Sequence, residues 1–238
     1  MSVLVIQNDP SDPVQLVGAW LAAHDLDLDV VMACHGDAVP SAVPPGIDAV
    51  IALGGVMNAN DDVAAPWLVA ERALLADAVR HDVPTLGICL GSQLLAVAVG
   101  GTVVQGKESE IGVVAVDRTP AGRIDAVTSA LGADTVLATH WHNDHITDLP
   151  ADATLLLTND TAPVQAFRVG ACAYGLQMHP EVTAEVFATW AQEPDDAVTA
   201  QGIDVQGAVT DVARYAPELE RTWQPVIDAW AQLVHQRG

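Results

Sequence analysis

The stretch TLGICLGSQLLA, Thr85–Ala96, places a cysteine between two glycines at the point where an apolar run gives way to a helical pattern. The run before the corner is typical of a buried strand. Glycine, which has no Cβ, tolerates the crowding of a tight strand-to-helix corner at Gly87 and Gly91. Cys89 then projects from the corner at a helix N-terminus, where the positive end of the helix dipole favours a thiolate. The pattern predicts a cysteine nucleophile, and the alternative is a buried structural cysteine beside a packing turn.

A second segment, LQMHPEV at 176–182, supplies the base that a thiol nucleophile needs. His179 and Glu181 are two residues apart, so in an extended chain both side chains point to the same side. The carboxylate can then hold one imidazole nitrogen and leave the other for the thiol, as in known nucleophile–base–orienter triads. We therefore predict a triad of Cys89, His179 and Glu181, with Pro180 ending the strand. The alternative is a polar histidine that merely closes a strand.

Acyl transfer also requires hydrogen-bond donors for the oxyanion that develops on the substrate. The backbone N–H of Leu90, directly after the nucleophile, is one candidate. The segment LGGVMN, 53–58, offers a second at Gly54 or Gly55, because glycine lets a loop approach closely. An ordinary strand-ending turn is the alternative for this loop.

Outward from the corner, short apolar runs alternate with helical patterns. Each run is bounded by Gly, Pro, Asp or Asn, and the runs lie at 3–7, 29–33, 48–55, 84–91 and 173–179. Helical patterns lie between several of them, at 13–24 and at 66–81. Buried strands that alternate with amphipathic helices predict an α/β fold, in which helices flank a mostly parallel central sheet.

The rest of the chain is organised differently. Between about 102 and 170, strand-like runs joined by short turns predict an antiparallel extension of the sheet. The end, about 182–238, is helical, with a polar connection at 192–207. An apolar stripe at helical spacing near the end is interpreted as core or helix docking, with a subunit interface as the alternative. The stripe consists of Val226, Ile227, Trp230, Leu233 and Val234.

Charge and cysteine content exclude some classes of partner. The 238 residues include 31 Asp and Glu against 9 Lys and Arg, a formal net charge of −22, so the surface repels nucleic acid and anionic lipid. The three cysteines are few and far apart, which fits a reducing cytoplasm better than a disulfide framework. Cys34 and Cys172 lie in apolar runs and are expected to be buried and inert. With no signal-peptide pattern and no apolar run of about 18 residues, we expect a cytoplasmic location and no membrane partner.

Together these motifs resemble class I glutamine amidotransferases, above all the stand-alone proteins similar to the glutaminase part of GMP synthase. The resemblance is carried by ALGGVMN, PWLVAERALL, LGICLGSQLLA, EIGVVAV, HWHND and GLQMHPEV, in that order along the chain. It implies a flavodoxin-like amidotransferase fold over residues 1–190. Residues 191–238 would form a helical extension packed on the same domain. It also implies a glutaminase that releases ammonia from the glutamine side chain without a cofactor.

The resemblance assigns a role to each candidate residue. Cys89 attacks the side-chain amide carbon of glutamine and forms a thioester. His179 protonates the departing ammonia and then activates water, while Glu181 orients His179. Gly55 and Leu90 supply the oxyanion N–H groups.

Two more residues fall where members of the family hold the substrate. Gln93, one helical turn past the nucleophile, matches a glutamine that helps to hold it. Asn143 lies in the segment His142–Asp144, which matches the clamp on the substrate's amino-acid end. One departure concerns the glycine loop, where Val56 replaces the usual proline and implies a differently shaped loop.

The reaction beyond ammonia release stays open. The sequence shows no synthetase domain, so the ammonia acceptor would lie on a separate synthetase subunit, or the chain would hydrolyse γ-glutamyl peptides or amides without such coupling. A non-catalytic or partner-activated subunit is a further alternative. The alternating histidines of HWHNDH, 140–145, are a pattern that can bind metal. We expect no metal there, because the resemblance already accounts for the segment.

Overall fold

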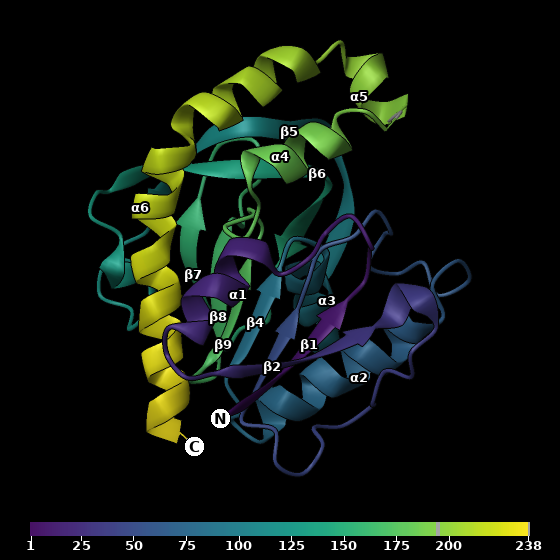
Figure 1. Ribbon diagram of the computed structural model, residues 1–238, viewed down its shortest axis with the longest axis vertical. Helices are drawn as coiled ribbons and strands as arrows, with labels where there is room; N and C mark the ends of the chain where they lie inside the picture. Colours follow the sequence, from purple (N-terminus) through teal and green to yellow (C-terminus); the bar gives the residue numbers. More distant parts are fainter. Residues whose placement is uncertain (194–195, 238) are drawn as a thin grey trace.

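The fold is built on one mixed sheet of nine strands, seen in a computed structural model that describes residues 1–193 and 196–237 (Figure 1). The strands lie side by side in the order β2-β1-β3-β4-β9-β8-β7-β5-β6. Their bounds are β1 Ser2–Gln7, β2 Asp27–Met32, β3 Ala49–Ala52, β4 Thr85–Ile88, β5 Thr102–Arg118, β6 Thr135–Asp148, β7 Ala153–Thr158, β8 Ala166–Val169 and β9 Ala173–Leu176.

The half of the sheet formed by β2, β1, β3, β4 and β9 is entirely parallel. Its strand order follows the flavodoxin-like pattern, in which the order reverses beside the first strand. Each of these strands coincides with one of the apolar runs. The prediction of an α/β fold with a mostly parallel central sheet is therefore confirmed.

Helices cover both faces of the parallel half. On one face, Val3 and Val5 of β1 share a hydrophobic cluster with α1 and α6, and on the other Leu4 and Ile6 share a cluster with α2 and α3. This alternation is what a strand buried on both sides requires. The α-helices are α1 Gln15–Ala22, α2 Trp67–Arg80, α3 Leu90–Ala98, α4 Ala184–Trp190, α5 Asp196–Gln201 and α6 Val205–Arg237.

The other half of the sheet, β8, β7, β5 and β6, is antiparallel, as expected. The expectation of short turns throughout was wrong between β5 and β6, which are joined by residues 119–134. This connection contains the 3₁₀ turn Thr128–Ala130. Within it, the carboxylate of Asp125 accepts hydrogen bonds from the backbone N–H groups of Val127 and Thr128.

The C-terminal region departs from the prediction at one point. The connection predicted at 192–207 contains α5, and residues 194–195 lie outside the described chain. The end of α5 is held on β5, because the side chain of Gln201 bonds both the backbone N–H and the hydroxyl of Ser109. Among the residues described, none of the helices combines the length and apolar character needed to cross a bilayer.

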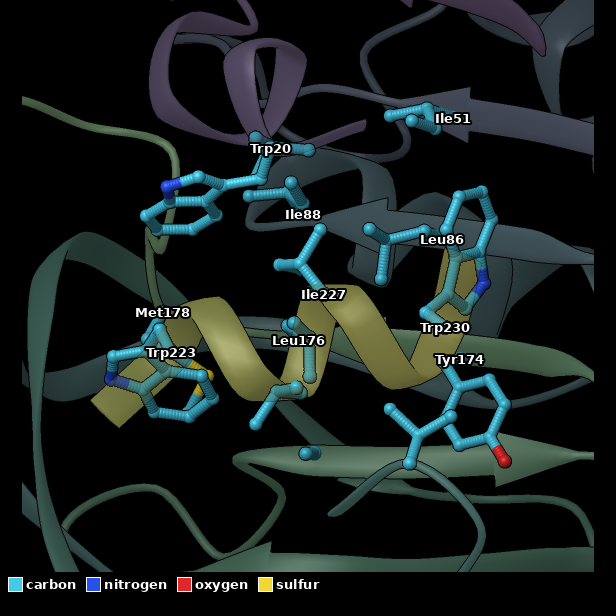
Figure 2. Close-up of a cluster of buried hydrophobic side chains, with 14 of the residues drawn as sticks. Trp20, Ile51, Leu86, Ile88, Tyr174, Leu176, Met178, Trp223, Ile227 and Trp230 are labelled. Carbon is cyan, nitrogen blue, oxygen red and sulfur yellow. The ribbon is translucent and has the colours of Figure 1, made fainter. Parts of the chain in front are cut away.

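Helix α6 contributes a large part of the core. Figure 2 shows Trp223, Ile227 and Trp230 of this helix facing the sheet, beside Leu176 and Tyr174 of β9. All five side chains are buried in the same cluster as β1, β3 and β4. The apolar stripe of α6 is therefore core, as interpreted. The division into 1–190 and 191–238 stays a prediction.

The two cysteines outside the corner differ from each other. Cys172 is buried, as expected, but Cys34 is half-exposed. It lies in the 3₁₀ turn Ala33–His35, which follows the end of β2 at the sheet edge, so its burial was predicted wrongly.

Candidate active site

A pocket of about 600 Å³ opens at the carboxyl ends of the parallel strands. Open α/β sheets bind ligands at this edge, because the loops that follow neighbouring strands meet there. Segments from far apart in the sequence converge on this pocket. Its wall includes most of the predicted site residues, namely Gly55, Cys89, Gln93, Asn143 and His179.

Cys89 occupies the corner between β4 and α3 with a positive φ of 48° and a ψ of −108°, a backbone conformation that residues with a side chain rarely adopt. A Cβ on Gly87 would lie 2.5 Å from the carbonyl oxygen of Gly91, and a Cβ on Gly91 would lie 2.0 Å from the carbonyl oxygen of Ala52 in β3. Since both obstacles are backbone, neither glycine can gain a side chain without moving a strand or a helix. The strained cysteine is thus fixed from both sides.

His179 and Glu181 meet as the sequence predicts, although not by the predicted route. The imidazole Nδ1 lies 2.6 Å from a carboxylate oxygen of Glu181. However, β9 ends at Leu176, so both residues lie in the turn after the strand and Pro180 does not end it. The turn is held by backbone hydrogen bonds from His179 to Thr139 and from Leu16 to Glu181.

The electrostatics of His179 favour the imidazolium. Burial lowers its pKa, but the charges of Cys89 and Glu181 and the hydrogen bond to Glu181 outweigh burial and raise the pKa well above the ordinary value. Its Nε2 has no hydrogen-bond partner in the described part of the chain. The sulfur of Cys89 faces the carbonyl oxygen of Trp141 at 3.9 Å and the amide of Gln177 at 3.7 Å. Cys89 and His179 therefore form an electrostatically coupled pair at the pocket wall.

The two predicted oxyanion residues lie next to each other. A Cβ on Gly55 would come within 3.2 Å of the Leu90 side chain, and Leu90 is the first residue of α3. Val56, which stands in place of the usual proline, is 79% exposed at the pocket. The side-chain amide of Asn58 donates to the Asp144 carboxylate at 2.6 Å, which ties the glycine loop to β6.

The two predicted substrate-holding residues differ in setting. Gln93 is buried, and its side-chain amide lies 3.2 Å from the Asp144 carbonyl oxygen and 3.3 Å from the Gln177 side-chain oxygen. Asn143 is half-buried at the pocket wall, in β6. Gln93 thus links the nucleophile helix α3 to the strand that carries Asn143.

Sequence reasoning missed two residues at the site. Gln177 touches the sulfur of Cys89 and stands two residues before His179, so the same alternation that paired His179 with Glu181 could have indicated it. Asp12 lies in the loop after β1, and its carboxyl group is close to both His179 and Glu181. One carboxyl oxygen of Asp12, one imidazole nitrogen of His179 and one carboxyl oxygen of Glu181 all lie within 4.8 Å of one another. No pattern in the sequence connects the loop of Asp12 to the turn after β9.

A second buried polar cluster reaches the pocket wall at His142. One carboxyl oxygen of Glu110 and one imidazole nitrogen each of His140 and His142 lie within 4.8 Å of one another, close enough to hold a metal ion. Glu110 already accepts hydrogen bonds from Asn159 and Gln165, both at 2.6 Å, and lies 3.1 Å from His142. The carboxylate is therefore satisfied without an ion, and the expectation of no metal stays a prediction.

Protonation within this cluster follows its burial. Burial lowers the pKa of His140 to about 3. For Glu110, burial opposes the charge, but the hydrogen bond from His142 and the two imidazoles lower the pKa to about 2. The cluster thus combines an ionised carboxylate with a neutral His140.

The glycine loop rests on a further buried group, Glu71 of α2. The amide of Asn8 donates to Glu71 at 3.0 Å and to the carbonyl oxygen of Leu53 at 3.1 Å, and Trp67 donates to the amide oxygen of Asn8. Burial raises the pKa of Glu71 to about 8, against the lowering effect of Asn8 and of Arg72. Glu71 is therefore mostly protonated at neutral pH and supports the loop as a neutral acid.

These observations agree with a comparison to known families. The family model for class I glutamine amidotransferases matches residues 23–191, which is more than half of the chain. The chain therefore belongs to the class I glutamine amidotransferase family.

The individual proteins to which the chain is similar include a glutamine amidotransferase-like protein and a GMP synthase subunit. It is 38% identical over 116 residues to YfeJ, a glutamine amidotransferase-like protein of Salmonella typhimurium, in a match that covers 49% of this chain and 48% of YfeJ. It is 30% identical over 166 residues to a subunit of the glutamine-hydrolysing GMP synthase of Thermoplasma acidophilum, covering 68% of this chain and 76% of that subunit. The chain spans about half the length of YfeJ.

Solved structures share the whole fold. A glutamine amidotransferase of Thermotoga maritima superposes with a TM-score of 0.84 at 26% identity over 98% of both chains. Another from Methylobacillus flagellatus gives 0.83 at 27% identity, covering 97% of this chain and 94% of that one. The arrangement of sheet and helices is therefore that of glutamine amidotransferases.

Replacement of Gly91 by alanine tests the corner. Because the new Cβ would collide with the backbone of β3, Gly91→Ala should lower the free energy of unfolding by about 1–3 kcal/mol and slow the alkylation of Cys89. Urea denaturation and site-resolved mass spectrometry measure the two effects. Gly132→Ala is the matched control, because no atom lies within 4 Å of a Cβ there. Equal behaviour of the two variants would refute the steric account.

Replacement of Glu71 by glutamine tests the buried acid. The folded chain holds the Glu71 proton up to a pH of about 8, whereas the unfolded chain loses it near the ordinary pKa of 4.5. The resulting stabilisation is complete below that lower value and is lost as the pH rises between the two. Glutamine keeps the acceptor for Asn8 without titrating, so the variant should gain on the wild type by up to about 1.4 kcal/mol per pH unit in this window. Denaturation curves measured across this pH window give the difference, and Glu218→Gln, at an exposed position, is the control. Parallel plots of the free energy of unfolding against pH for wild type and Glu71→Gln would contradict the prediction.

Proposed function

We propose that the chain hydrolyses the side-chain amide of glutamine, or of a γ-glutamyl compound, through a thioester on Cys89. One observation carries the proposal. A strained cysteine at a helix N-terminus shares a pocket with a buried imidazole whose other nitrogen is held by a carboxylate. This is the arrangement of nucleophile, base and orienting acid that acyl transfer uses.

In the first half of the reaction, the Cys89 thiolate attacks the amide carbon. A carbon–sulfur bond forms, the carbon–nitrogen bond breaks, and the departing amine takes a proton from the His179 imidazolium. Glu181 fixes the tautomer and orientation of His179 at 2.6 Å. The backbone N–H groups of Gly55 and Leu90 stabilise the oxyanion.

In the second half, the neutral imidazole of His179 accepts a proton from water. The oxygen attacks the thioester carbon, the carbon–sulfur bond breaks, and the acid product leaves with the Cys89 thiolate regenerated. Gln93 and Asn143 hold the amino-acid end of the substrate during both steps. The raised pKa of His179 supports this cycle, because the imidazolium must be present when the amine departs.

The leaving group is ammonia in the simplest case. The similarity to the GMP synthase of Thermoplasma acidophilum supports a partner synthetase that receives this ammonia in the cytoplasm, where thiols stay reduced. The volume of the pocket, about 600 Å³, favours a second candidate, hydrolysis of larger γ-glutamyl amides. Sites of roughly 300–1,000 Å³ accommodate drug-sized ligands, so a leaving group larger than ammonia can be held.

Replacement of Cys89 by alanine tests the proposal. Loss of the nucleophile should lower kcat by at least about 10⁴-fold on glutamine, γ-glutamyl dipeptides and γ-glutamyl amines alike. Product glutamate is measured for each substrate, and the wild-type preference distinguishes glutamine from the conjugates. Cys34→Ala is the control, because Cys34 is half-exposed and outside the pocket. Unchanged turnover in Cys89→Ala would rule out the thioester.

A further inference from the structure

Asp12 is a buried acid at the triad that the mechanism above does not use. It lies in the loop after β1, is 3% exposed, and lines the pocket. No N–H or O–H group among the described residues donates a hydrogen bond to either carboxyl oxygen. An unsatisfied carboxyl group in such a place costs free energy of folding, so its presence requires an explanation.

The structure makes room for Asp12 at this point. A Cβ on Gly54 would lie 2.1 Å from a carboxyl oxygen of Asp12 and 3.1 Å from Cε1 of His179. The missing side chain of Gly54 therefore leaves the space in which Asp12 and the imidazole come together. This gives the first glycine of the loop a role distinct from that of Gly55.

The loop of Asp12 is also fastened to the turn that carries the triad. The backbone N–H of Leu16 donates to the carbonyl oxygen of Glu181 at 3.0 Å. The indole of Trp190 donates to the carbonyl oxygen of Ser11 at 2.8 Å, and its ring packs on His179 with centroids 4.9 Å apart. Asp12 is thus held against the triad by the contacts of Ser11, just before it in the chain, and of Leu16, a few residues after it.

The charges around Asp12 favour the protonated form of its carboxyl group. Glu181 is fully buried, one of its oxygens accepts from His179, and the other has no partner among the described residues. Two adjacent buried carboxylates cannot both stay ionised, because they repel in a medium of low dielectric. Burial, then the charge of Glu181, raises the pKa of Asp12 well above its usual value, although His179 opposes this and Asp9 adds to it.

We propose that Asp12 is a positioning residue of this amidase site, whose protonated carboxyl group donates a hydrogen bond to the free oxygen of Glu181. The chain of contacts then runs from Asp12 through Glu181 and His179 to Cys89. Asp12 holds the orienting carboxylate in place without adding a second negative charge. This role rests on the proposed function, since it acts through the triad.

Two variants separate hydrogen bonding from mere packing. Asp12→Ala removes the donor and should lower kcat by about 10- to 100-fold, because Glu181 loses its support and His179 shifts. Asp12→Asn supplies an N–H donor of the same shape and should recover most of that loss. The exposed Asp29→Asn is the control for the change of charge. An asparagine variant no better than alanine, or an alanine variant within about twofold of wild type, would overturn the proposal.

Infrared spectroscopy tests the protonation directly. At neutral pH the wild type should show a protonated carboxyl band that Asp12→Asn lacks. Because Glu71 also stays protonated, the comparison is made in a Glu71→Gln background. Identical spectra with and without the Asp12 carboxyl group would mean that it is ionised, and would overturn the proposal.

Alkylation of Cys89 by iodoacetamide makes the test independent of turnover. Site-resolved mass spectrometry should find slower alkylation at neutral pH in Asp12→Ala and recovery in Asp12→Asn, because a displaced imidazolium stabilises the thiolate less. If no γ-glutamyl amide is hydrolysed by the wild type, the proposed function fails, yet this rate and the infrared band still decide the role of Asp12. Equal alkylation rates in wild type and Asp12→Ala would refute it.

Discussion

The contact of Gly91 with the backbone of β3 is the constraint on which the site depends. Because a Cβ on Gly91 would lie 2.0 Å from the carbonyl oxygen of Ala52, the start of helix α3 packs directly against the end of β3. Cys89 is then held with a positive φ, a conformation that a cysteine adopts only at a cost in free energy. The position of the sulfur relative to the glycine loop after β3 is therefore set by backbone packing.

Parallel pairing brings the other components to the same edge of the sheet. The strands β1, β3, β4 and β9 are neighbours, so the loops after them share one pocket although the chain separates them. The loops are then linked by side chains, such as Asn58 to Asp144 and Trp190 to Ser11. Burial of these groups strengthens their mutual electrostatics, which is why the pKa of His179 depends on Cys89 and Glu181.

Local patterns in the sequence predicted much of this arrangement. The apolar runs indicated the parallel strands, and the spacing of glycines around Cys89 indicated the corner, because both reflect short-range packing. The connection 119–134 and helix α5 were missed, since their structure depends on hydrogen bonds to distant residues. Asp12 was missed for the same reason, because its burial follows from contacts between the loop after β1 and the turn after β9.

The central claim is that the sulfur of Cys89 carries the acyl group during turnover. Acid quenching of the wild type while it hydrolyses glutamine or a γ-glutamyl amide, followed by peptide mass spectrometry, measures this most directly. We expect the mass of one γ-glutamyl group on the peptide that contains Cys89, and no such mass on the corresponding peptide of Cys89→Ala. Turnover with no adduct at any stage of the quench, or an adduct on a different residue, would contradict the claim.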